Sequence, residues 1–509
     1  MIYTWRDLAK SSSEISFNNT LERLPEIDFG LPGSKEAFSF KISPGISSYS
    51  TKISELNQKH LAPMLEHAKK VIPAHKHIQT PIYLMATAGM RLLDDDSQKQ
   101  ILYRACEFFK KNSIFYIKNC KAHFNVISGE EEGAYGWLSV NYLKNRFLPL
   151  INHTSEQSQL PSQSQNSLLS RSTTGEAETF GFLDMGGAST QIAFQLNSKI
   201  SDISQDEITK IKLMKIDGNS IEVNLFVTTF LGYGTNEARR RYVESIASKT
   251  PKIADFEYPV ISDPCLPKGL FVQVKSNNFV LMGSGKLDSC VKETYKLLNK
   301  KEFCAKPPCL FNGVHFPTLN LKNMQFLGVS EYWYASNDIL QLGGLWDMFK
   351  FIKKARDFCS LDWNSAKSKY IDTPGIIEDR IRLQCFKASW IITILHDGFG
   401  ILPELFLDSN SDVDAALESL SRSDHKPNFH SINEINSREA SWTLGAILLK
   451  VSESIPNKRD FNSTLSFIRL PKSSKKSGQT GDEDFGAGIQ ETTPDSVLKV
   501  EVHIKFRPF

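Results

Sequence analysis

The stretch FGFLDMGGASTQIAF (180–194) constrains the fold most strongly, because it has the pattern strand, turn, strand. A strand-like run leads into Asp184, and an almost side-chain-free turn follows at Gly186 and Gly187. Glycines allow tight turns and let a ligand approach the backbone amides. Successive N–H groups in such a turn form an anion-binding concavity. The stretch predicts either a plain β-hairpin or a hairpin that binds an anion.

The carboxylate in this stretch indicates which ligands the hairpin could bind. Asp184 would repel an anion unless a divalent cation lay between them, and Mg²⁺ or Ca²⁺ would neutralise both, directly or through water. Ser189 adds a hydroxyl donor, and Gln191 adds a neutral amide that can reach the same space. In the alternative, the glycines serve only the geometry of the hairpin. The stretch alone leaves both interpretations open.

A second motif is VISGEEEGAYGWLSVNYL (126–143), in which three glutamates precede Gly133. A solvated helix start is one interpretation, since carboxylates suit helix N-termini. The apolar residues directly after it, including Tyr135 and Trp137, favour a helix packed into the core. At least one glutamate is then expected to face a cleft, where a carboxylate that takes a proton from water contributes ~10²–10⁴ in rate.

The third motif, YLMATAGMRLLDDD (83–96), is a buried strand that ends at Thr87-Ala88-Gly89, with Arg91 soon after. It could be an ordinary strand-to-helix turn with an exposed arginine. It could also bind a ligand, because open α/β sheets bind ligands at the carboxyl ends of their strands. All three motifs occur at strand termini, which together favours a functional site.

Strand-like and helix-like segments alternate through the first 130 residues and predict an α/β architecture. Short strands are expected at IFYIK (114–118) and FNVIS (124–128), and an edge strand at VLKVEVHIKF (497–506). The Ser/Gln/Thr tract at 154–179 lacks periodicity and predicts a flexible insertion. The tail at 471–509 is predicted to be mostly disordered.

Charge and cysteine content limit the function classes. The formal net charge is only +3, so no global basic field indicates nucleic acid. No apolar run reaches the ~18 residues of a membrane span, and the N-terminus lacks signal-peptide features. Eight cysteines and three glycosylation sequons, at Asn18, Asn152 and Asn462, nevertheless favour an oxidising lumen over eight buried thiols. Eight cysteines allow 105 pairings, so their sequence fixes none of them.

The motifs resemble those of the nucleoside triphosphate diphosphohydrolases, the apyrase family, and particularly its fungal Golgi branch. The resemblance covers nearly all of 1–455. It is carried by ATAGMRLL (86–93), GEEEGAYGWLSVNYL (129–143) and LDMGGASTQIAF (183–194), with support from KISPGISSY (41–49), TTFLGYGTNEARRRY, PCLFNGVHFP, SEYWYASNDILQLGG and SWTLGAILL.

The resemblance implies a two-lobed α/β fold similar to actin, hexokinase and the Hsp70 ATPase domain, a ribonuclease H-like fold with nucleotide phosphates between the lobes. Lobe I would comprise 1–128 plus 437–470, and lobe II 129–436 with the phosphate hairpin at 180–194. We also predict that the cysteines pair sequentially, as Cys106–Cys120, Cys265–Cys290, Cys304–Cys309 and Cys359–Cys385.

The family's functional residues carry over to matching positions in this chain. The resemblance implies that Glu132 activates the attacking water and that Asp184 holds Ca²⁺ or Mg²⁺ through its hydration shell. The other matching residues would orient that water (Ser189, Gln191), line its site (Thr87, Ala88), give amides to phosphate (Gly186, Gly187, Ala188) or stack on the base (Tyr334).

The chain departs from the family pattern at both ends. Family members carry a first phosphate hairpin similar to DAGSSGSR, whereas no DxGSS run occurs here and MIYTWRD resembles the strand that follows it. We therefore expect a first lobe truncated at its N-terminus. Loss of one oxyanion donor alone costs ~2.7–4 kcal/mol, so the chain as written is expected to be weakly active or inactive. The C-terminal membrane anchor of Golgi relatives also has no counterpart here.

The leading hypothesis is hydrolysis of nucleoside di- and triphosphates, such as GDP, UDP and ATP, in the Golgi lumen or at its membrane, in support of glycosylation. The alternative from another class is a noncatalytic nucleotide-binding or partner-binding module. A third possibility is a sugar kinase or chaperone-like ATPase on the same fold, against which the Glu132 segment and the cysteine couples argue.

Overall fold

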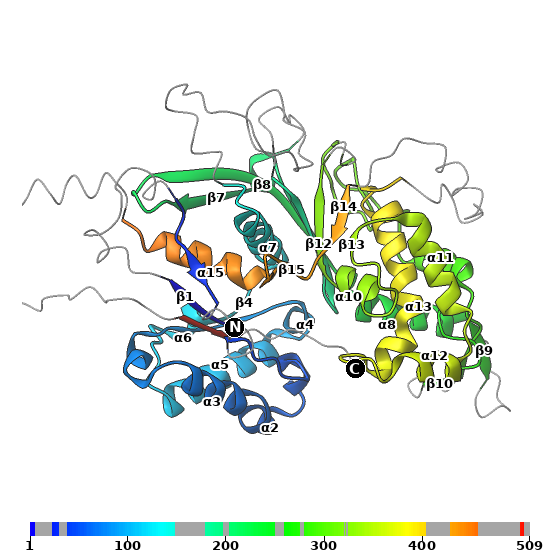
Figure 1. Cartoon of the computed structure of the whole chain (residues 1–509), viewed down its shortest axis with the longest axis horizontal. Coiled ribbons are helices and arrows are strands. Elements are labelled where there is room, and N and C mark those ends of the chain that lie inside the picture. Colours follow the sequence, from blue (N-terminus) through cyan, green and yellow to red (C-terminus); the bar gives the residue numbers. More distant parts are fainter. Residues whose placement is uncertain are drawn as a thin grey trace, which may run out of the picture.

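The chain forms a two-lobed mixed α/β structure built on two large sheets, which confirms the predicted fold class (Figure 1). Its structure is a computed structural model. The three sequons, nearly all of the 154–179 insertion and most of the 471–509 tail lie outside the described residues. Those residues are 1–5, 23–29, 38–147, 179–196, 203–249, 259–274, 279–319, 321, 324–403, 428–456 and 499–502.

The first sheet has five strands in the order β2-β1-β17-β3-β4. Strand β17 pairs antiparallel with β1 and parallel with β3. The prediction of an edge strand near the C-terminus is therefore wrong, because this strand has partners on both sides. The strands are β1 (Ile2–Trp5), β2 (Ile27–Asp28), β3 (Ile82–Ala86), β4 (Phe124–Val126) and β17 (Lys499–Val502).

Short and long helices cover the outer side of this sheet (Figure 1). Their apolar faces, with those of β3 and β4, form one buried cluster around Leu65, Leu84 and Phe109. The helices are α2 (Ile53–Leu56), η2 (Asn57–Leu61), α3 (Ala62–Val71), α4 (Ala88–Arg91), α5 (Asp95–Asn112) and α6 (Cys120–His123), with 3-10 turns η1 (Ile46–Tyr49) and η3 (Ala74–Gln79).

The second sheet has seven strands in the order β13-β14-β12-β5-β6-β8-β7. The predicted hairpin is confirmed as β5 and β6, which pair antiparallel, while β5 also pairs parallel with β12. The strands are β5 (Gly181–Met185), β6 (Ser189–Gln195), β7 (Ile208–Met214), β8 (Ser220–Leu231), β12 (Phe326–Ser330), β13 (Gly344–Leu345) and β14 (Phe429–Ser431).

Strand alternation decides which face of this sheet carries the hairpin's polar groups. Phe182 packs in the cluster with helix α7 (Gly129–Leu143), whereas Leu183 packs in the cluster on the opposite face. Successive side chains point to opposite faces, so Asp184 points to the α7 face. Gln191 is its direct cross-strand partner and shares that face.

The opposite face of the seven-stranded sheet is covered by a group of helices, and a small third sheet packs against two of these helices rather than on the sheet itself (Figure 1). These elements are α8 (Thr235–Lys249), α9 (Leu287–Lys296), α10 (Glu331–Asn337), α11 (Met348–Cys359), α12 (Trp363–Tyr370), α13 (Glu378–Thr393), the π-helix η7 (Ile394–Gly398) and strands β9 (Val260–Asp263), β10 (Phe271–Val274) and β11 (Phe279–Gly283). A 3-10 turn, η5 (Gln205–Glu207), precedes β7.

Helix α15 (Trp442–Glu453) lies between α7 and the first sheet. Its Thr443 is joined to Tyr3 of β1 by a 2.5 Å hydroxyl–hydroxyl hydrogen bond. A short hairpin of β15 (Glu434–Ile435) and β16 (Arg438–Glu439) precedes it. Helices α7 and α15 therefore pack between the two large sheets. The lobe boundaries expected at 128–129 and 436–437 remain predictions.

Helix α7 packs unusually close to the second sheet. A Cβ at Gly129 would lie 2.2 Å from Thr229 Oγ1, and one at Gly136 would lie 2.1 Å from a ring carbon of Phe182. Only glycine permits this approach at these positions, so the helix that carries Glu132 lies in direct contact with the hairpin strands.

The four predicted disulfides are confirmed, and the described residues include no free cysteine. Cys106–Cys120 joins α5 to α6, and Cys359–Cys385 joins α11 to α13. The latter pair fixes the helix that contributes Arg380 and Lys387 beside the functional site described next.

Candidate active site

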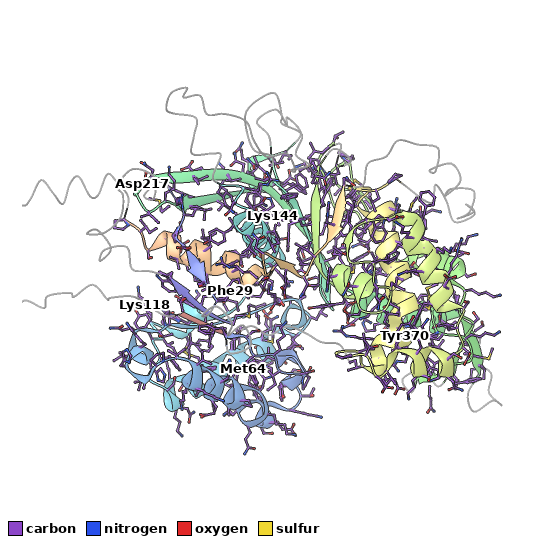
Figure 2. All side chains as sticks on the ribbon, in the orientation of Figure 1. Phe29, Met64, Lys118, Lys144, Asp217 and Tyr370 are labelled. Atoms are coloured by element: carbon purple, nitrogen blue, oxygen red, sulfur yellow. A yellow bond between two sulfur atoms is a disulfide. The ribbon has the colours of Figure 1, made fainter. Side chains whose placement is uncertain are left out.

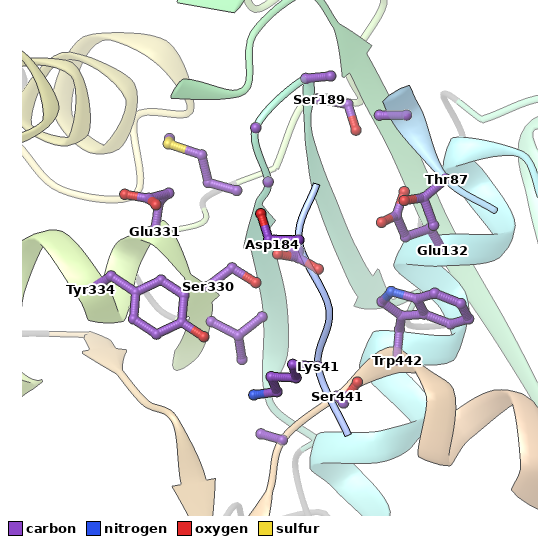
Figure 3. A pocket seen from close by; sticks show the side chains of 18 of the residues that line it. Lys41, Thr87, Glu132, Asp184, Ser189, Ser330, Glu331, Tyr334, Ser441 and Trp442 are labelled. Atoms are coloured by element: carbon purple, nitrogen blue, oxygen red, sulfur yellow. The ribbon is translucent and has the colours of Figure 1, made fainter. Parts of the chain in front are cut away.

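A cavity of about 370 Å³ opens between the two sheets, at the turn of the β5–β6 hairpin (Figure 3). Of the residues predicted for the site, all except Gln191 line it. The predicted residues that line the cavity are Thr87, Ala88, Glu132, Asp184, Gly186, Gly187, Ala188, Ser189 and Tyr334. The remaining lining residues come from the segment at 41–43, from β5 and β12, from the start of α10 and from the start of α15.

The hairpin turn is held from behind by the start of α8. The carbonyl of Gly186 accepts a hydrogen bond from the Thr235 amide (3.0 Å), and that of Gly187 from the Asn236 amide (2.8 Å). In a trans peptide the C=O and the following N–H point in opposite directions. The amides of Gly187 and Ala188 therefore point away from α8, toward the cavity, as an anion cradle requires.

The three consecutive glutamates at the start of α7 have different surroundings. Glu131 forms a capping box with Ser128, in which each side chain accepts a hydrogen bond from the other's backbone amide. Glu130 is exposed, whereas Glu132 is 7 % exposed and lines the cavity. The expectation that one glutamate faces a cleft holds for Glu132.

Arg91 contradicts the interpretation of an exposed arginine. Its side chain is 15 % exposed and donates from Nη2 to Glu132 Oε2 at 2.7 Å and to Ser189 Oγ at 3.1 Å. Gln191 donates to the same Ser189 Oγ at 2.6 Å and to Thr229 Oγ1 at 3.0 Å. Gln191 therefore acts on the cavity through Ser189 rather than by lining it.

The environment of Glu132 alters its acidity. Burial raises the pKa of its carboxyl from 4.5 to about 7, Arg91 opposes that rise, and the nearby Asp184 carboxylate reinforces it. A carboxylate with a pKa near neutrality is suited to accept a proton under physiological conditions.

The part of the cavity opposite Glu132 contains the ring of Tyr334, whereas Trp442 lies on the Glu132 side (Figure 3). Tyr334, in α10, lies under the guanidinium of Arg380, whose central carbon is 5.0 Å from the ring centroid, and Arg380 is itself paired with Asp338. Ser330, just before this helix, has a φ of 61°, an uncommon conformation for a non-glycine residue. A planar ligand ring would have an aromatic partner here.

Sequence comparison identifies the family. The model of the GDA1/CD39 (nucleoside phosphatase) family matches residues 1–464. The chain belongs to this family.

Relatives within the GDA1/CD39 family include the Golgi apyrase of Schizosaccharomyces pombe, 38% identical over 89% of this chain and 73% of the relative. The Golgi apyrase of Saccharomyces cerevisiae is 36% identical over 89% and 68%, and the nucleoside-diphosphatase mig-23 of Caenorhabditis elegans is 36% identical over 80% and 69%. A crystal structure of nucleoside triphosphate hydrolases from Neospora caninum is similar with a TM-score of 0.48 and 15% identity, covering 83% of this chain and 80% of that one.

The donors in this GDA1/CD39-family site suit a hydrated cation rather than direct coordination. Within the described ranges, no group of three or more His, Cys, Asp or Glu side chains could hold a metal ion. Asp184 is 5 % exposed and lines the cavity, and its negative charge raises the pKa of Glu132. Carboxylate oxygen is a ligand type of Ca²⁺ and Mg²⁺, which keep water molecules when protein ligands are few.

Our sequence reasoning missed several residues of the cavity. Lys41 lies in KISPGISSY and Trp442 in SWTLGAILL, two segments that matched the family without any assigned role. Glu331 also lines the cavity and forms a buried pair with Lys387 of α13, 2.9 Å from carboxylate oxygen to ammonium nitrogen. Only the family match could have indicated these residues, because their partners lie far away in sequence.

Arg91 provides a test of the acidity of Glu132. In the unmodified protein we expect the acid limb of the pH profile of kcat/KM near pH 7, the pKa of Glu132. Arg91→Met should move this limb to higher pH, because the substitution removes a cation that favours the ionised carboxylate. Arg104→Met, at an exposed position of α5, is the control. A limb that stays in place would show that Arg91 does not influence the acidity of Glu132.

Among the helices that the structure describes, none combines the length and apolar character needed to cross a membrane.

Proposed function

We propose that this protein hydrolyses the terminal phosphate of nucleoside di- and triphosphates, with Glu132 as the base that activates the attacking water. The observation that carries the proposal is one cavity that contains a glycine hairpin, a buried carboxylate with a pKa near 7 and an aromatic ring. Family membership supports the same conclusion.

The hydrogen bonds around Ser189 suggest how the water is oriented. Ser189 Oγ accepts from both Arg91 and Gln191, which leaves its own hydrogen to be donated. A water that accepts this hydrogen bond could donate to Glu132, whose Oε2 is already bound to Arg91. The water would then have a lone pair directed at phosphorus. As its oxygen bonds to phosphorus, the bond from phosphorus to the bridging oxygen would break, the shortened nucleotide would leave with that oxygen, and the proton of the water would pass to the carboxylate.

The other predicted residues would position the substrate. The amides of Gly187 and Ala188 would bind phosphate oxygens, Thr87 and Ala88 would line the water site, and Tyr334 would stack on the base. Asp184 would hold Ca²⁺ or Mg²⁺ through water. When bound, that cation would neutralise phosphate charge, on which phosphoryl transfer depends.

The proposed location is the lumen or membrane of the Golgi apparatus. The two fungal relatives are named Golgi apyrases, and the four disulfides are typical of an oxidising compartment. There the protein would remove nucleoside diphosphates, such as GDP and UDP, left by glycosyl transfer. No nucleic acid partner is proposed.

Phosphate release tests the proposal. Purified protein is incubated with GDP, UDP and ATP in Ca²⁺ or Mg²⁺ and then in excess EDTA, and free phosphate is measured. We expect release from di- and triphosphates that stops with EDTA, because the charge between Asp184 and the phosphates is no longer neutralised. The same assay tests the expectation of weak turnover from the lack of a DxGSS run.

Nucleotide binding without phosphate release under every metal condition would instead support the noncatalytic module. Release that persists in EDTA would contradict the role of the cation. Isothermal titration with each nucleotide distinguishes a protein that binds but does not turn over from one that does not bind.

A further inference from the structure

We propose that one edge of the first sheet docks the protein onto a lipid bilayer that contains anionic phospholipids. Three exposed side chains form the apolar patch of this edge: Ile78, Ile114 and Tyr116. Four exposed lysines form its lysine rim: Lys110, Lys111, Lys118 and Lys121. The proposal goes beyond the proposed function and does not depend on it, since none of these residues lines the cavity.

The side chains of the apolar patch are strongly exposed. Ile78 and Ile114 are each 65% exposed and Tyr116 is 48% exposed, whereas Phe115, between the latter two, is buried. The backbone of this segment alternates as a strand does, so one apolar side chain points inward and its two neighbours remain in water.

Backbone and ring contacts hold the apolar patch together. The Tyr116 amide donates to the Thr80 carbonyl at 2.9 Å, directly after the 3-10 turn η3. The ring centroids of His77, in η3, and Phe115 are 4.4 Å apart. The turn that carries Ile78 therefore packs directly against segment 114–116. Exposed apolar side chains gathered in this way mark an interaction surface.

The lysine rim reaches the same edge because of the topology. Helix α5 ends directly before the apolar segment, and Lys110 and Lys111 lie in its last turn. Lys118 follows that segment, and Lys121 lies in α6, directly before β4. Because β3 and β4 are parallel, their starts lie at one edge of the sheet, and the lysines surround the apolar patch there.

Carboxylates are scarce at this edge. Residues 67–93 contain none, and residues 97–129 contain only Glu107 against six lysines and arginines. Glu66, just before the first of these stretches, is paired with Lys69 at 3.4 Å. The edge therefore has a local positive charge that the overall net charge of +3 does not reveal.

This combination favours a membrane over a protein partner. Lysine is depleted at protein–protein interfaces. At an anionic bilayer, ammonium groups attract lipid phosphates while apolar side chains enter the headgroup region. A tyrosine is suited to that depth, because its ring is apolar and its hydroxyl is polar.

Docking at this edge leaves the cavity open. Strand β3 begins at Ile82, whose amide donates to the Tyr116 carbonyl at 3.3 Å, and Thr87, after the other end of β3, lines the cavity. The apolar patch and the cavity are therefore separated by about 17 Å along this strand. In Figure 2, Lys118 lies on the side away from the second sheet, whereas α4, which follows β3, lies toward that sheet in Figure 1.

The test measures co-sedimentation of the full chain with vesicles. We expect binding to phosphatidylcholine vesicles that contain phosphatidylserine, and about tenfold weaker binding to phosphatidylcholine alone. Ile78→Ser with Ile114→Ser should weaken binding to the anionic vesicles about tenfold, because less apolar surface enters the bilayer. Lys110→Gln with Lys111→Gln should also weaken it about tenfold, and added salt should act in the same direction.

Phe271→Ser is the matched control for the apolar patch, because Phe271 is 61% exposed but lies in β10 of the small third sheet. Lys300→Gln with Lys301→Gln is the control for the lysine rim, since these adjacent exposed lysines follow α9. Controls that weaken binding as much as the patch and rim variants would overturn the proposal. Equal binding of the unmodified protein to both kinds of vesicle, or binding to neither, would overturn it as well.

A nitroxide attached at Ile114→Cys measures insertion directly. It should become less accessible to a water-soluble relaxation agent when anionic vesicles are added, and unchanged accessibility would contradict docking through the apolar patch. Self-association that is lost in Ile78→Ser with Ile114→Ser, without any vesicle binding, would assign the surface to a second copy of the chain instead. Thermal unfolding verifies that the variants fold, and Ile114→Ser alone replaces the double variant if that one does not.

Discussion

Glu132→Gln is expected to lower kcat for nucleotide hydrolysis by ~10²–10⁴ while the nucleotide dissociation constant changes little. Glutamine keeps the size of the side chain and can still contact the attacking water, but it cannot accept the proton. Glu130 is exposed and Glu131 is held in the capping box, and neither lines the cavity, so neither can take the place of Glu132. Single-turnover phosphate release and calorimetric binding measure the two quantities separately.

The same substitution should raise stability at neutral pH. The folded-state pKa of Glu132 is raised from 4.5 to about 7, so the folded protein binds the proton more tightly than the unfolded chain. The associated stability is present below pH 4.5 and is lost as pH rises through 7. Glutamine does not ionise, so Glu132→Gln should be roughly 1–3 kcal/mol more stable at pH 7 and no more stable at pH 4.

Glu130→Gln is the control for both measurements, because this neighbour is exposed and takes no part in the capping box. It should change neither turnover nor stability appreciably. Turnover by Glu132→Gln equal to that of the unmodified protein would refute its role as the base.

Gly234→Ala is expected to reduce kcat/KM by about 10²-fold, although residue 234 does not line the cavity. A Cβ at Gly234 would lie 2.4 Å from Ala188 N, 2.5 Å from Gly187 C and 2.6 Å from Gly186 O. These are backbone atoms, so no change of side-chain rotamer can relieve the overlap. The turn must shift, and the amides that would bind phosphate shift with it.

Gly398→Ala is a matched control, because its added methyl would meet only side-chain atoms, none closer than 3.4 Å. Both variants add one buried methyl group, and only Gly234→Ala should raise KM and lower kcat together. Overpacking should also cost Gly234→Ala about 1–3 kcal/mol of stability, measurable by chemical denaturation. Normal kinetics in Gly234→Ala would show that the position of the hairpin turn is not critical.

Local patterns predicted the elements that depend on local forces. Alternation and glycines identified the β5–β6 hairpin, and the glutamate-rich motif followed by apolar residues identified α7 as a helix packed into the core. The strand expected at IFYIK did not form beyond a single bridge between Tyr116 and Pro81, because Ile114 and Tyr116 are exposed and have no core to pack against. Apolar residues alone do not specify a strand when tertiary packing does not bury them.

Contacts between site residues could be predicted from the sequence only where both residues lie in one motif. Asp184 and Ser189 lie in one hairpin, so their proximity follows from the turn itself. Arg91 meets Glu132 across 41 positions and Ser189 across 98, and Lys41 meets Glu439 across 398. No periodicity or spacing encodes such contacts, since they depend on how the sheets and helices pack. Reasoning from single motifs therefore left open whether Arg91 is an exposed surface residue or lies at a binding site.

The tight contact between α7 and its sheet has a consequence for catalysis. Where the helix backbone already touches Thr229 and Phe182 at Gly129 and Gly136, solvent has no room between this helix and the sheet behind Glu132, the proposed base. The free-energy cost of removing water from Glu132 then arises once, when the chain folds, rather than each time substrate binds. A catalytic group prepared in this way needs little rearrangement when a nucleotide arrives, so reorganisation energy contributes little to the barrier.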